Sequence, residues 1–412
     1  MKETFCFAKS KTKILRSKIY NHYSLLIINY SLFVRSDYME KKKILILTSY
    51  VTGHGHKSIT NALEEELKKR PDIDYKAVEA FELGGKAGVK IGKLYAPIIR
   101  NSEDMWKFIF KLSAKQPGSV RAAVREIIKN KFYKLVDEYK PDLIVSVHPA
   151  FTSAIVDLIN RRRLKIPFAI VLADLISISP LWLDHRANLI IAPTKEASIA
   201  AQKRGVNEDK IKILNLPVRK EIIEAAKNVT EVDECKIRNK ENIDFLLMSG
   251  GEGSGDMGSV VEKLLRIDNS RISVIAGRNS KLKEVLELKF KDHMDRVTIY
   301  GFVKDVENLM MTHDVGIVRG SPNVLMECIT CTLPVIITGT LPGQEEGNID
   351  FILGNRLGLL WHKKHGFINT IDRLLRNNRE RLIEIKKNQL AFRDLEAAKK
   401  IVDEFEKLLK KR

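Results

Sequence analysis

The feature that most constrains this chain is a glycine-bearing loop that follows an apolar run at two places. Residues 44–56 read ILILTSYVTGHGH, and residues 245–255 read FLLMSGGEGSG. Each loop is followed by a helical pattern. A buried parallel strand that ends in a glycine-rich turn before a helix presents backbone N–H groups to a phosphate. We therefore expect an α/β protein with two Rossmann-like domains, whose parallel sheets face a shared cleft.

Strand-like apolar runs alternate with helical patterns through most of the chain, which predicts parallel sheets with helices on both faces. The helix after the first loop is expected over residues 57–70. A charged, weakly apolar stretch at 216–242 separates two series of runs. We expect domains at 39–220 and 221–376 and a final helical segment at 377–412. The runs are residues 44–47, 143–147, 168–172, 189–192, 211–214, 245–248, 273–276, 297–300, 315–318 and 334–338.

The positive charge lies in the N-terminal half of the chain. The formal net charge is +19, and residues 84–135 carry twelve basic and three acidic residues. Apolar residues, including Trp106 and Phe108, recur among these lysines and arginines. Such a basic amphipathic segment is typical of helices that lie on an anionic membrane surface. A solvated basic surface is the alternative, and nucleic-acid binding is disfavoured because no recognition motif accompanies the charge.

The four cysteines predict neither a disulfide framework nor a metal site. Cys328 and Cys331 form a lone CxxC whose apolar flanks indicate a helix running into a core strand. No run reaches the roughly 18–20 apolar residues that span a bilayer. We expect a cytoplasmic protein, peripheral on the inner face of the cell membrane. Residues 1–38 are either an upstream extension outside the fold or a loose membrane-touching tail.

Three polar side chains follow apolar strands of the first half, where α/β proteins bind ligands. His56 ends the first glycine loop, and its imidazole titrates near neutrality, which suits a general base. Asp174 follows the run 168–172 and could orient His56, hold an acceptor or act as the base. His148 follows the run 143–147, where a ligand contact and a structural role are equally open.

The order of short motifs resembles the monogalactosyldiacylglycerol synthase family, which includes processive diacylglycerol glucosyltransferases. This family is related to the enzyme that adds N-acetylglucosamine to the peptidoglycan lipid precursor. The resemblance implies an inverting GT-B glycosyltransferase with a UDP-sugar donor, a lipid acceptor, no catalytic metal and no cofactor. The motifs are TGHGHKS (52–58), SVHPAFTS (146–153), ADL (173–175), PLW (180–182), LPVRKE (216–221), LLMSGGEGSG (246–255), AGRN (276–279), YGFV (300–303) and PGQEEGN (342–348).

The resemblance also implies roles for residues in both halves. The glycine loop of the second half would supply N–H donors to the diphosphate, through Ser249, Gly250, Gly251 and Gly253. The other expected donor-binding residues are Phe302 and Val303 around uracil, Glu327 at the ribose, Gln344 and Glu345 at the sugar hydroxyls, and Arg278, Arg319 and Ser321, to which no single part of the donor is assigned. The expected acceptor-binding residues are His148, Trp106 and Trp182.

One segment departs from the family pattern. Residues 319–323 read RGSPN where the family has Lys-Pro-Gly-Gly, and Pro322 removes an N–H that could bind phosphate. We expect Asn323 to cap the following helix instead. Two alternatives therefore stay open beside the glycosyltransferase: a UDP-N-acetylglucosamine 2-epimerase, and a non-catalytic protein that binds nucleotide sugars. The sequence does not distinguish glucose, galactose and N-acetylglucosamine as the transferred sugar.

Overall fold

The computed structural model describes residues 41–52, 54–101, 117–248, 256–361 and 366–410. The proposed extension, residues 1–38, lies outside the described residues. The chain divides into a small unit, residues 1–42 with 71–74, and a large unit, residues 43–70 with 75–412. In the small unit the Lys42 N–H donates to the Asp72 carbonyl at 3.0 Å. The large unit holds most of both sheets and all the helices described below.

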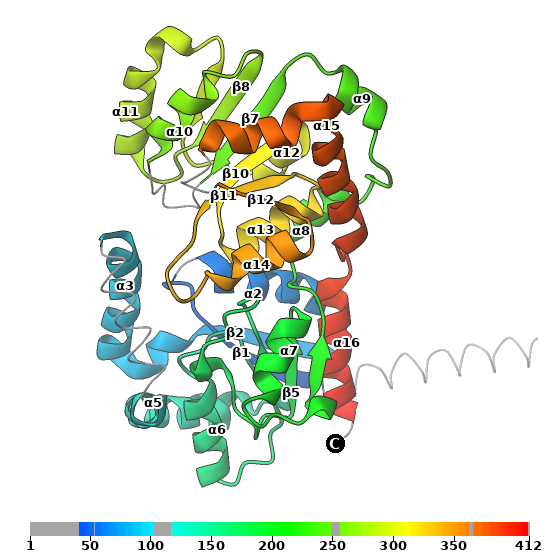
Figure 1. Cartoon of the computed structure of the whole chain (residues 1–412). Helices are drawn as coiled ribbons and strands as arrows, with labels where there is room; N and C mark the ends of the chain where they lie inside the picture. Colours follow the sequence, from blue (N-terminus) through cyan, green and yellow to red (C-terminus); the bar gives the residue numbers. More distant parts are fainter. Residues whose placement is uncertain (1–40, 53, 102–116, 249–255, 362–365, 411–412) are drawn as a thin grey trace, which may run out of the picture. The chain divides into compact units, whose positions relative to one another are not determined.

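The first sheet has six strands in the order β2-β1-β3-β4-β5-β6. Its strands β1, β2 and β5 are labelled in Figure 1. The pair β1–β3 and the following pairs out to β6 are parallel. The chain runs outward in opposite directions from β1 and β3, so the topological switch point lies between these two strands. The strands are β1 (Lys42–Thr48), β2 (Ile73–Glu79), β3 (Leu143–Ser146), β4 (Phe168–Val171), β5 (Leu189–Ala192) and β6 (Ile211–Ile213).

The second sheet also has six strands, in the order β12-β11-β10-β7-β8-β9, and its pairs are parallel. Its switch point lies between β7 and β10, where Met248 pairs with Val318. The strands are β7 (Ile243–Met248), β8 (Ser270–Ile275), β9 (Val297–Tyr300), β10 (Val315–Arg319), β11 (Val335–Gly339) and β12 (Gly358–Leu360).

Helices connect most of the strands, as parallel pairing requires. Within α15 the backbone leaves helical geometry at residues 376–379, where the helix kinks. The α-helices are α2 (His54–Leu67), α3 (Gly85–Asn101), α5 (Pro117–Tyr139), α6 (Thr152–Arg161), α7 (Lys195–Gln202), α8 (Lys220–Ala226), α9 (Glu234–Asn239), α10 (Met257–Leu264), α11 (Ser280–Lys289), α12 (Val306–Thr312), α13 (Pro322–Thr330), α14 (Gly347–Gly354), α15 (Phe367–Phe392) and α16 (Ala397–Lys410). Short 3₁₀ helices are η1 (Ala80–Gly84), η2 (Pro180–Trp182), η3 (Glu208–Lys210) and η4 (Lys291–His293).

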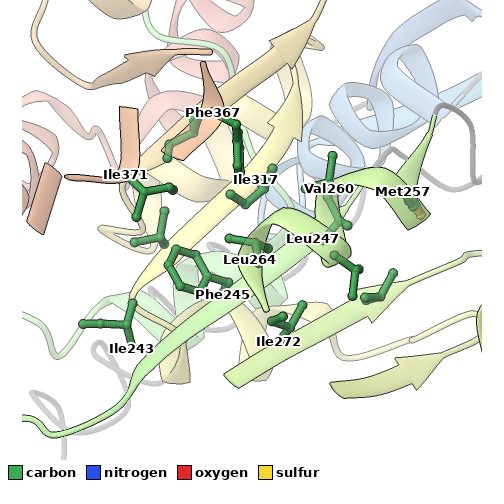
Figure 2. Packing of buried hydrophobic residues seen from close by; sticks show 14 of the residues in the cluster. Ile243, Phe245, Leu247, Met257, Val260, Leu264, Ile272, Ile317, Phe367 and Ile371 are labelled. Carbon is green, nitrogen blue, oxygen red and sulfur yellow. The ribbon is translucent and has the colours of Figure 1, made fainter. Parts of the chain in front are cut away.

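The core of the second half lies between its sheet and the helices α10 and α15 (Figure 2). Phe245 and Ile317 come from neighbouring strands, Leu264 from α10 and Ile371 from α15, and all four are buried. Burying such a side chain contributes roughly 1.5–3 kcal/mol. The apolar runs of the sequence are therefore the interior of a sheet buried on both faces.

The GT-B architecture predicted from the sequence is confirmed, with two differences in the sheets. All ten predicted strands are present, but β2 and β12 were missed. β2 reads IDYKAVE and mixes buried with exposed positions at a sheet edge, while β12 has only three residues. Such edge strands lack the continuous apolar run of a central parallel strand.

Two helix predictions need correction. The helix predicted over 57–70 is α2, which begins at His54 and ends at Leu67, so the loop histidines lie in its first turn. Asn323 does not cap α13. Ser321 holds the N-cap position and Pro322 is the first helical residue, a place where proline costs no intrahelical hydrogen bond.

The final segment is helical, as predicted. It does not stand apart, because α16 packs against α2 and β3 of the first half. Arg70, which follows α2, donates from Nη2 to the Asp403 carboxylate at 2.7 Å. The last described helix therefore packs on the first half.

Candidate active site

His56 lies at the switch point of the first sheet, in the first turn of α2. Its side chain is 9% exposed, and among the described atoms its Nδ1 has no hydrogen-bond partner. Burial lowers the pKa of His56 to about 4, and a hydrogen bond with the Val147 backbone opposes this shift. The imidazole is therefore neutral at physiological pH, and its buried Nδ1, which has no partner among the described atoms, can accept a proton.

His148 follows β3, on the other side of the same switch point. Its ring centroid lies 4.5 Å from that of His56. The Ala150 N–H donates to His148 Nδ1 at 3.2 Å, and Nε2 lies 3.1 Å from the Thr52 hydroxyl. Burial lowers the pKa of His148 well below its usual value, and His56 lowers it further. The two candidate histidines are thus in direct contact.

Glu79, which the sequence analysis missed, organises the loop between β1 and α2. Its carboxylate accepts from the backbone N–H groups of Val51 at 3.2 Å and Phe81 at 3.0 Å, and from that of Tyr50. The Ser49 hydroxyl lies 3.4 Å from the same carboxylate. The only sequence signal was an acidic residue at the end of an alternating run.

Asp174 is buried and joins two neighbours that lie far apart in the sequence. Its Oδ2 accepts from Trp182 Nε1 at 2.6 Å, and its Oδ1 accepts from Gln344 Nε2 at 3.2 Å. Burial raises the pKa of Asp174 to about 6, while these two hydrogen bonds oppose the shift. The described hydrogen bonds do not join Asp174 to His56; the Trp182 ring, 5.9 Å from the His56 ring, lies between them.

The loop that carries Gln344 is fixed from both sides. Glu345 Oε2 accepts from the Leu341 N–H at 2.8 Å, and burial raises the pKa of Glu345. The Gly347 N–H donates to the Ser177 hydroxyl at 3.1 Å. Asn348 Nδ2 donates to the Gly320 carbonyl at 2.7 Å, and Asn348 Oδ1 has no partner among the described atoms. The PGQEEGN motif therefore contacts both the ADL loop and the end of β10.

Glu327 pairs with Arg219, which lies 108 residues earlier in the LPVRKE motif. Arg219 Nε donates to Glu327 Oε1 at 2.8 Å. Burial raises the pKa of Glu327, and Arg219 opposes this shift. The ribose-binding role predicted for Glu327 stays a prediction, and Arg219 is a partner that the sequence analysis missed.

The remaining donor-site predictions fall in three places. Ser249, Gly250, Gly251 and Gly253 lie outside the described residues. Arg278 stacks its guanidinium 4.6 Å from the Phe302 ring centroid, and Phe302 is 54% exposed beside the half-buried Val303. Arg319 ends β10, and Ser321 holds the N-cap position of α13 without capping through its side chain.

The described parts of the basic segment are α3 and the part of α5 up to residue 135. Lys86, Lys90 and Lys93 are exposed on α3, and together with Val89 they line a cavity of about 450 Å³. Gly92, on another side of α3, is buried, and a Cβ atom there would lie 2.6 Å from Val51 Cγ2 and 2.9 Å from Phe81 Cγ. Glycine at this position lets α3 approach the loop that Glu79 organises. Trp106 lies outside the described residues.

No helix in the described ranges has the length and apolar character to cross a bilayer. The same ranges contain no group of three or more His, Cys, Asp or Glu side chains placed to hold a metal ion. Cys328 and Cys331 are buried free thiols on and beside α13, as their flanking sequence predicts.

Comparison with known proteins supports the resemblance that was inferred from the order of the motifs. Residues 56–218 match the model of the monogalactosyldiacylglycerol (MGDG) synthase family, and residues 257–377 match that of the glycosyl transferases group 1. Similar curated proteins include the probable monogalactosyldiacylglycerol synthase 2 of Oryza sativa subsp. indica and the monogalactosyldiacylglycerol synthase 3 of Arabidopsis thaliana. Each is 27% identical, over 89% of this chain and 81% of the relative.

Similar solved structures share the fold. MurG of Acinetobacter baumannii matches with a TM-score of 0.58 and 13% identity, over 89% of this chain and 99% of that chain. The UDP-GlcNAc 2-epimerase of Neisseria meningitidis, bound to UDP-GlcNAc, gives the same TM-score and identity, over 89% of this chain and all of that one. The motifs and the curated relatives therefore agree that the chain resembles the monogalactosyldiacylglycerol synthase family, with residues 56–218 matching that family's model, and the chain is a glycosyltransferase with the GT-B fold.

Proposed function

We propose that this protein is an inverting, metal-independent transferase that moves a hexose from a UDP-sugar to diacylglycerol or a related lipid. The observation that carries the proposal is that the buried, neutral His56 at the switch point of the first sheet has an Nδ1 with no partner among the described atoms. The curated relatives are named monogalactosyldiacylglycerol synthases. Among the structural neighbours, MnaA of S. aureus and HepE of Anabaena were crystallised with UDP.

His56 acts as the general base in this proposal. The acceptor hydroxyl oxygen attacks the anomeric carbon from the face opposite UDP, and the bond from that carbon to the diphosphate oxygen breaks. The hydroxyl proton passes to His56 Nδ1. A single in-line displacement inverts the anomeric centre. A base whose pKa is about 4 suffices, because the attacking oxygen becomes strongly acidic as its new bond forms.

The second half holds the donor. Backbone N–H groups of residues 249–253 would stabilise the departing diphosphate without a metal. Gln344 and Glu345 read the sugar hydroxyls, and Asp174 fixes the amide of Gln344. Arg219 holds Glu327 through a hydrogen bond to Oε1, and the Glu327 carboxylate accepts hydrogen bonds from the ribose hydroxyls. Phe302, with its exposed ring, stacks against uracil.

The exposed lysines of α3 provide the membrane contact in this proposal. Lysines near an anionic leaflet contribute about 1 kcal/mol each to binding. Lys86, Lys90 and Lys93 lie on one side of α3, so a single surface can meet all three at once. We propose that the protein works as a peripheral protein on the cytoplasmic, inner face of the cell membrane.

Transfer of radiolabelled sugar into extracted lipid tests the enzymatic proposal. Purified protein is incubated with diacylglycerol vesicles and each common UDP-sugar in a chelating buffer. We expect one UDP-sugar to label lipid and His56→Ala to abolish labelling. Binding of UDP by the wild type without labelling from any UDP-sugar would contradict the proposal and favour a non-catalytic binding protein.

The same reaction without lipid distinguishes the epimerase. Proton NMR of the UDP-sugar should show no change in its sugar configuration when acceptor is absent. Conversion of UDP-N-acetylglucosamine to its 2-epimer in this sample would replace the transferase proposal.

Vesicle flotation tests the membrane contact. We expect Lys86→Gln combined with Lys90→Gln and Lys93→Gln to weaken binding to anionic vesicles by about 100-fold, which corresponds to three lost lysines. The matched control removes three exposed lysines of α16 (Lys399, Lys407 and Lys410) and should bind like the wild type. Equal losses in both triple variants would show a general charge effect and not a docking face.

A further inference from the structure

We propose that His148 is a positioning residue, fixed as the neutral Nε2–H tautomer by Thr52 and Ala150, which holds the His56 ring in place and makes no contact with the acceptor. This inference rests on the proposed role of His56 as the base. The sequence alone predicted that His148, at the end of a strand, contacts the acceptor; the present inference replaces that role.

The hydrogen bonds of His148 determine its tautomer. A backbone N–H only donates, so Nδ1, which faces the Ala150 N–H at 3.2 Å, must be an acceptor. The ring proton then lies on Nε2, which donates to the Thr52 hydroxyl oxygen at 3.1 Å. In a doubly protonated ring the Nδ1–H group would face the Ala150 N–H, and two donors cannot form a hydrogen bond with each other. Both ring nitrogens are therefore used within the first half, and neither is open to a substrate hydroxyl.

The His148 ring also lies within an aromatic cluster. Its centroid is 5.4 Å from those of Phe81 and Phe151, and 4.5 Å from that of His56. It is 5% exposed. Because these contacts hold the ring from several sides, rotation of His148 would require His56 or a phenylalanine to move. His148 therefore packs against the His56 ring and, together with the hydrogen bond between His56 and the Val147 backbone, sets where His56 Nδ1 points.

The hydroxyl that accepts from His148 is itself fixed. The Thr52 N–H donates to the Ser49 hydroxyl at 3.2 Å, and that hydroxyl lies 3.4 Å from the Glu79 carboxylate. Glu79 also binds the Phe81 N–H. One carboxylate thus secures both the Thr52 loop and an aromatic neighbour of His148, which leaves the His148 ring a single orientation.

A pair of substitutions at Thr52 tests the proposal. Thr52→Val keeps the side-chain shape but removes the hydroxyl, whereas Thr52→Ser keeps the hydroxyl. We expect Thr52→Val to lower kcat by roughly 10- to 100-fold with little change in either KM, since a misplaced base slows chemistry without weakening substrate binding. Thr52→Ser should stay within about threefold of the wild type. An increase in acceptor KM at unchanged kcat, or full activity of Thr52→Val, would overturn the positioning role.

Nitrogen NMR of protein labelled at histidine gives a readout that does not need activity. Wild-type His148 should show a pyridine-like Nδ1 and a protonated Nε2 at neutral pH, and Thr52→Val should shift the His56 signals. Thr152→Val is the matched control, because the Thr152 hydroxyl donates to the His148 carbonyl and does not touch the ring nitrogens. A protonated Nδ1 on His148, or unchanged His56 signals in Thr52→Val, would overturn the inference. Absence of sugar transfer by the wild type would overturn the proposed function alone.

Discussion

Replacement of Asp174 by asparagine tests how burial controls the charge of the site. Asp174 accepts from Trp182 Nε1 and Gln344 Nε2. Asparagine can keep both hydrogen bonds. Its side-chain oxygen can accept from Trp182 Nε1, and its NH₂ group can donate to the side-chain oxygen of Gln344 once the Gln344 amide has flipped. Asp174→Asn therefore removes a titrating group while it preserves the contacts.

The magnitude follows from the raised pKa. Burial raises the pKa of Asp174 from 3.8 to about 6, and its folded form therefore binds a proton more tightly than its unfolded form. The stability from this preference is fully present below the unfolded pKa and is lost as pH rises through the folded pKa. The complete shift is worth about 3 kcal/mol. Between about pH 5 and about pH 7.5 the wild type should lose about 1.4 kcal/mol of stability relative to Asp174→Asn.

Urea unfolding of both proteins at these two pH values measures this difference. Other titrating groups are common to the pair and cancel in the comparison. Asp184→Asn serves as the control, because the hydrogen bonds from Arg186 outweigh burial and hold the pKa of Asp184 below its usual value of 3.8. The Asp184 carboxyl is therefore ionised in both the folded and the unfolded protein at these two pH values, and the stability difference between the wild type and Asp184→Asn should stay nearly constant. A pH-independent difference between the wild type and Asp174→Asn would refute the argument that burial dominates at Asp174.

Three further substitutions probe the supports of the site. Gly347→Ala would bring a Cβ atom within 2.8 Å of Ser177 Oγ, so we expect donor KM to rise by about tenfold, measured by steady-state kinetics. Glu79→Gln replaces one carboxylate oxygen with an amide NH₂ group, so the N–H groups that donate to that oxygen lose their acceptor, and the change should cost about 1–3 kcal/mol in urea unfolding. Gly92→Ala should lower the melting temperature, whereas Gly118→Ala, which has no atom within 4 Å of the added Cβ, should not.

The parallel sheets were predictable because their central strands are continuous apolar runs. Two examples are Phe245–Met248 and Leu189–Ala192, which are buried on both faces. A short, continuous apolar run of this kind is typical of a central strand in a parallel sheet. The edge strands β2 and β12 were not predictable on this basis. One mixes polar and apolar residues, and the other is too short to show any period.

Three candidate site residues of the first half could be predicted from the residues alone, because they lie in the loops or first helical turn that follow apolar strands. His56, His148 and Asp174 each follow an apolar run, and the sheet brings them to one edge. The hydrogen bonds that hold these side chains join residues whose spacing along the sequence shows no recognisable pattern. Gln344 lies 170 residues from Asp174 in the chain, and their hydrogen bond depends on a tertiary contact that local patterns do not encode.

Strand order explains why residues from distant segments meet at His56. The first sheet continues from β1 to β2 on one side and from β3 to β6 on the other, so the connections after β1 and β3 leave in opposite directions. His56 and His148 occupy the opening that this divergence creates. Trp182 links this pair to Asp174, which accepts from Gln344. Because Asp174 and Trp182 are buried and Gln344 donates to Asp174, a shift of the Gln344 loop changes the surroundings of Asp174 and Trp182. The base and the sugar-reading loop are therefore coupled by contact, which is a physical reason for catalysis to depend on both halves of the chain.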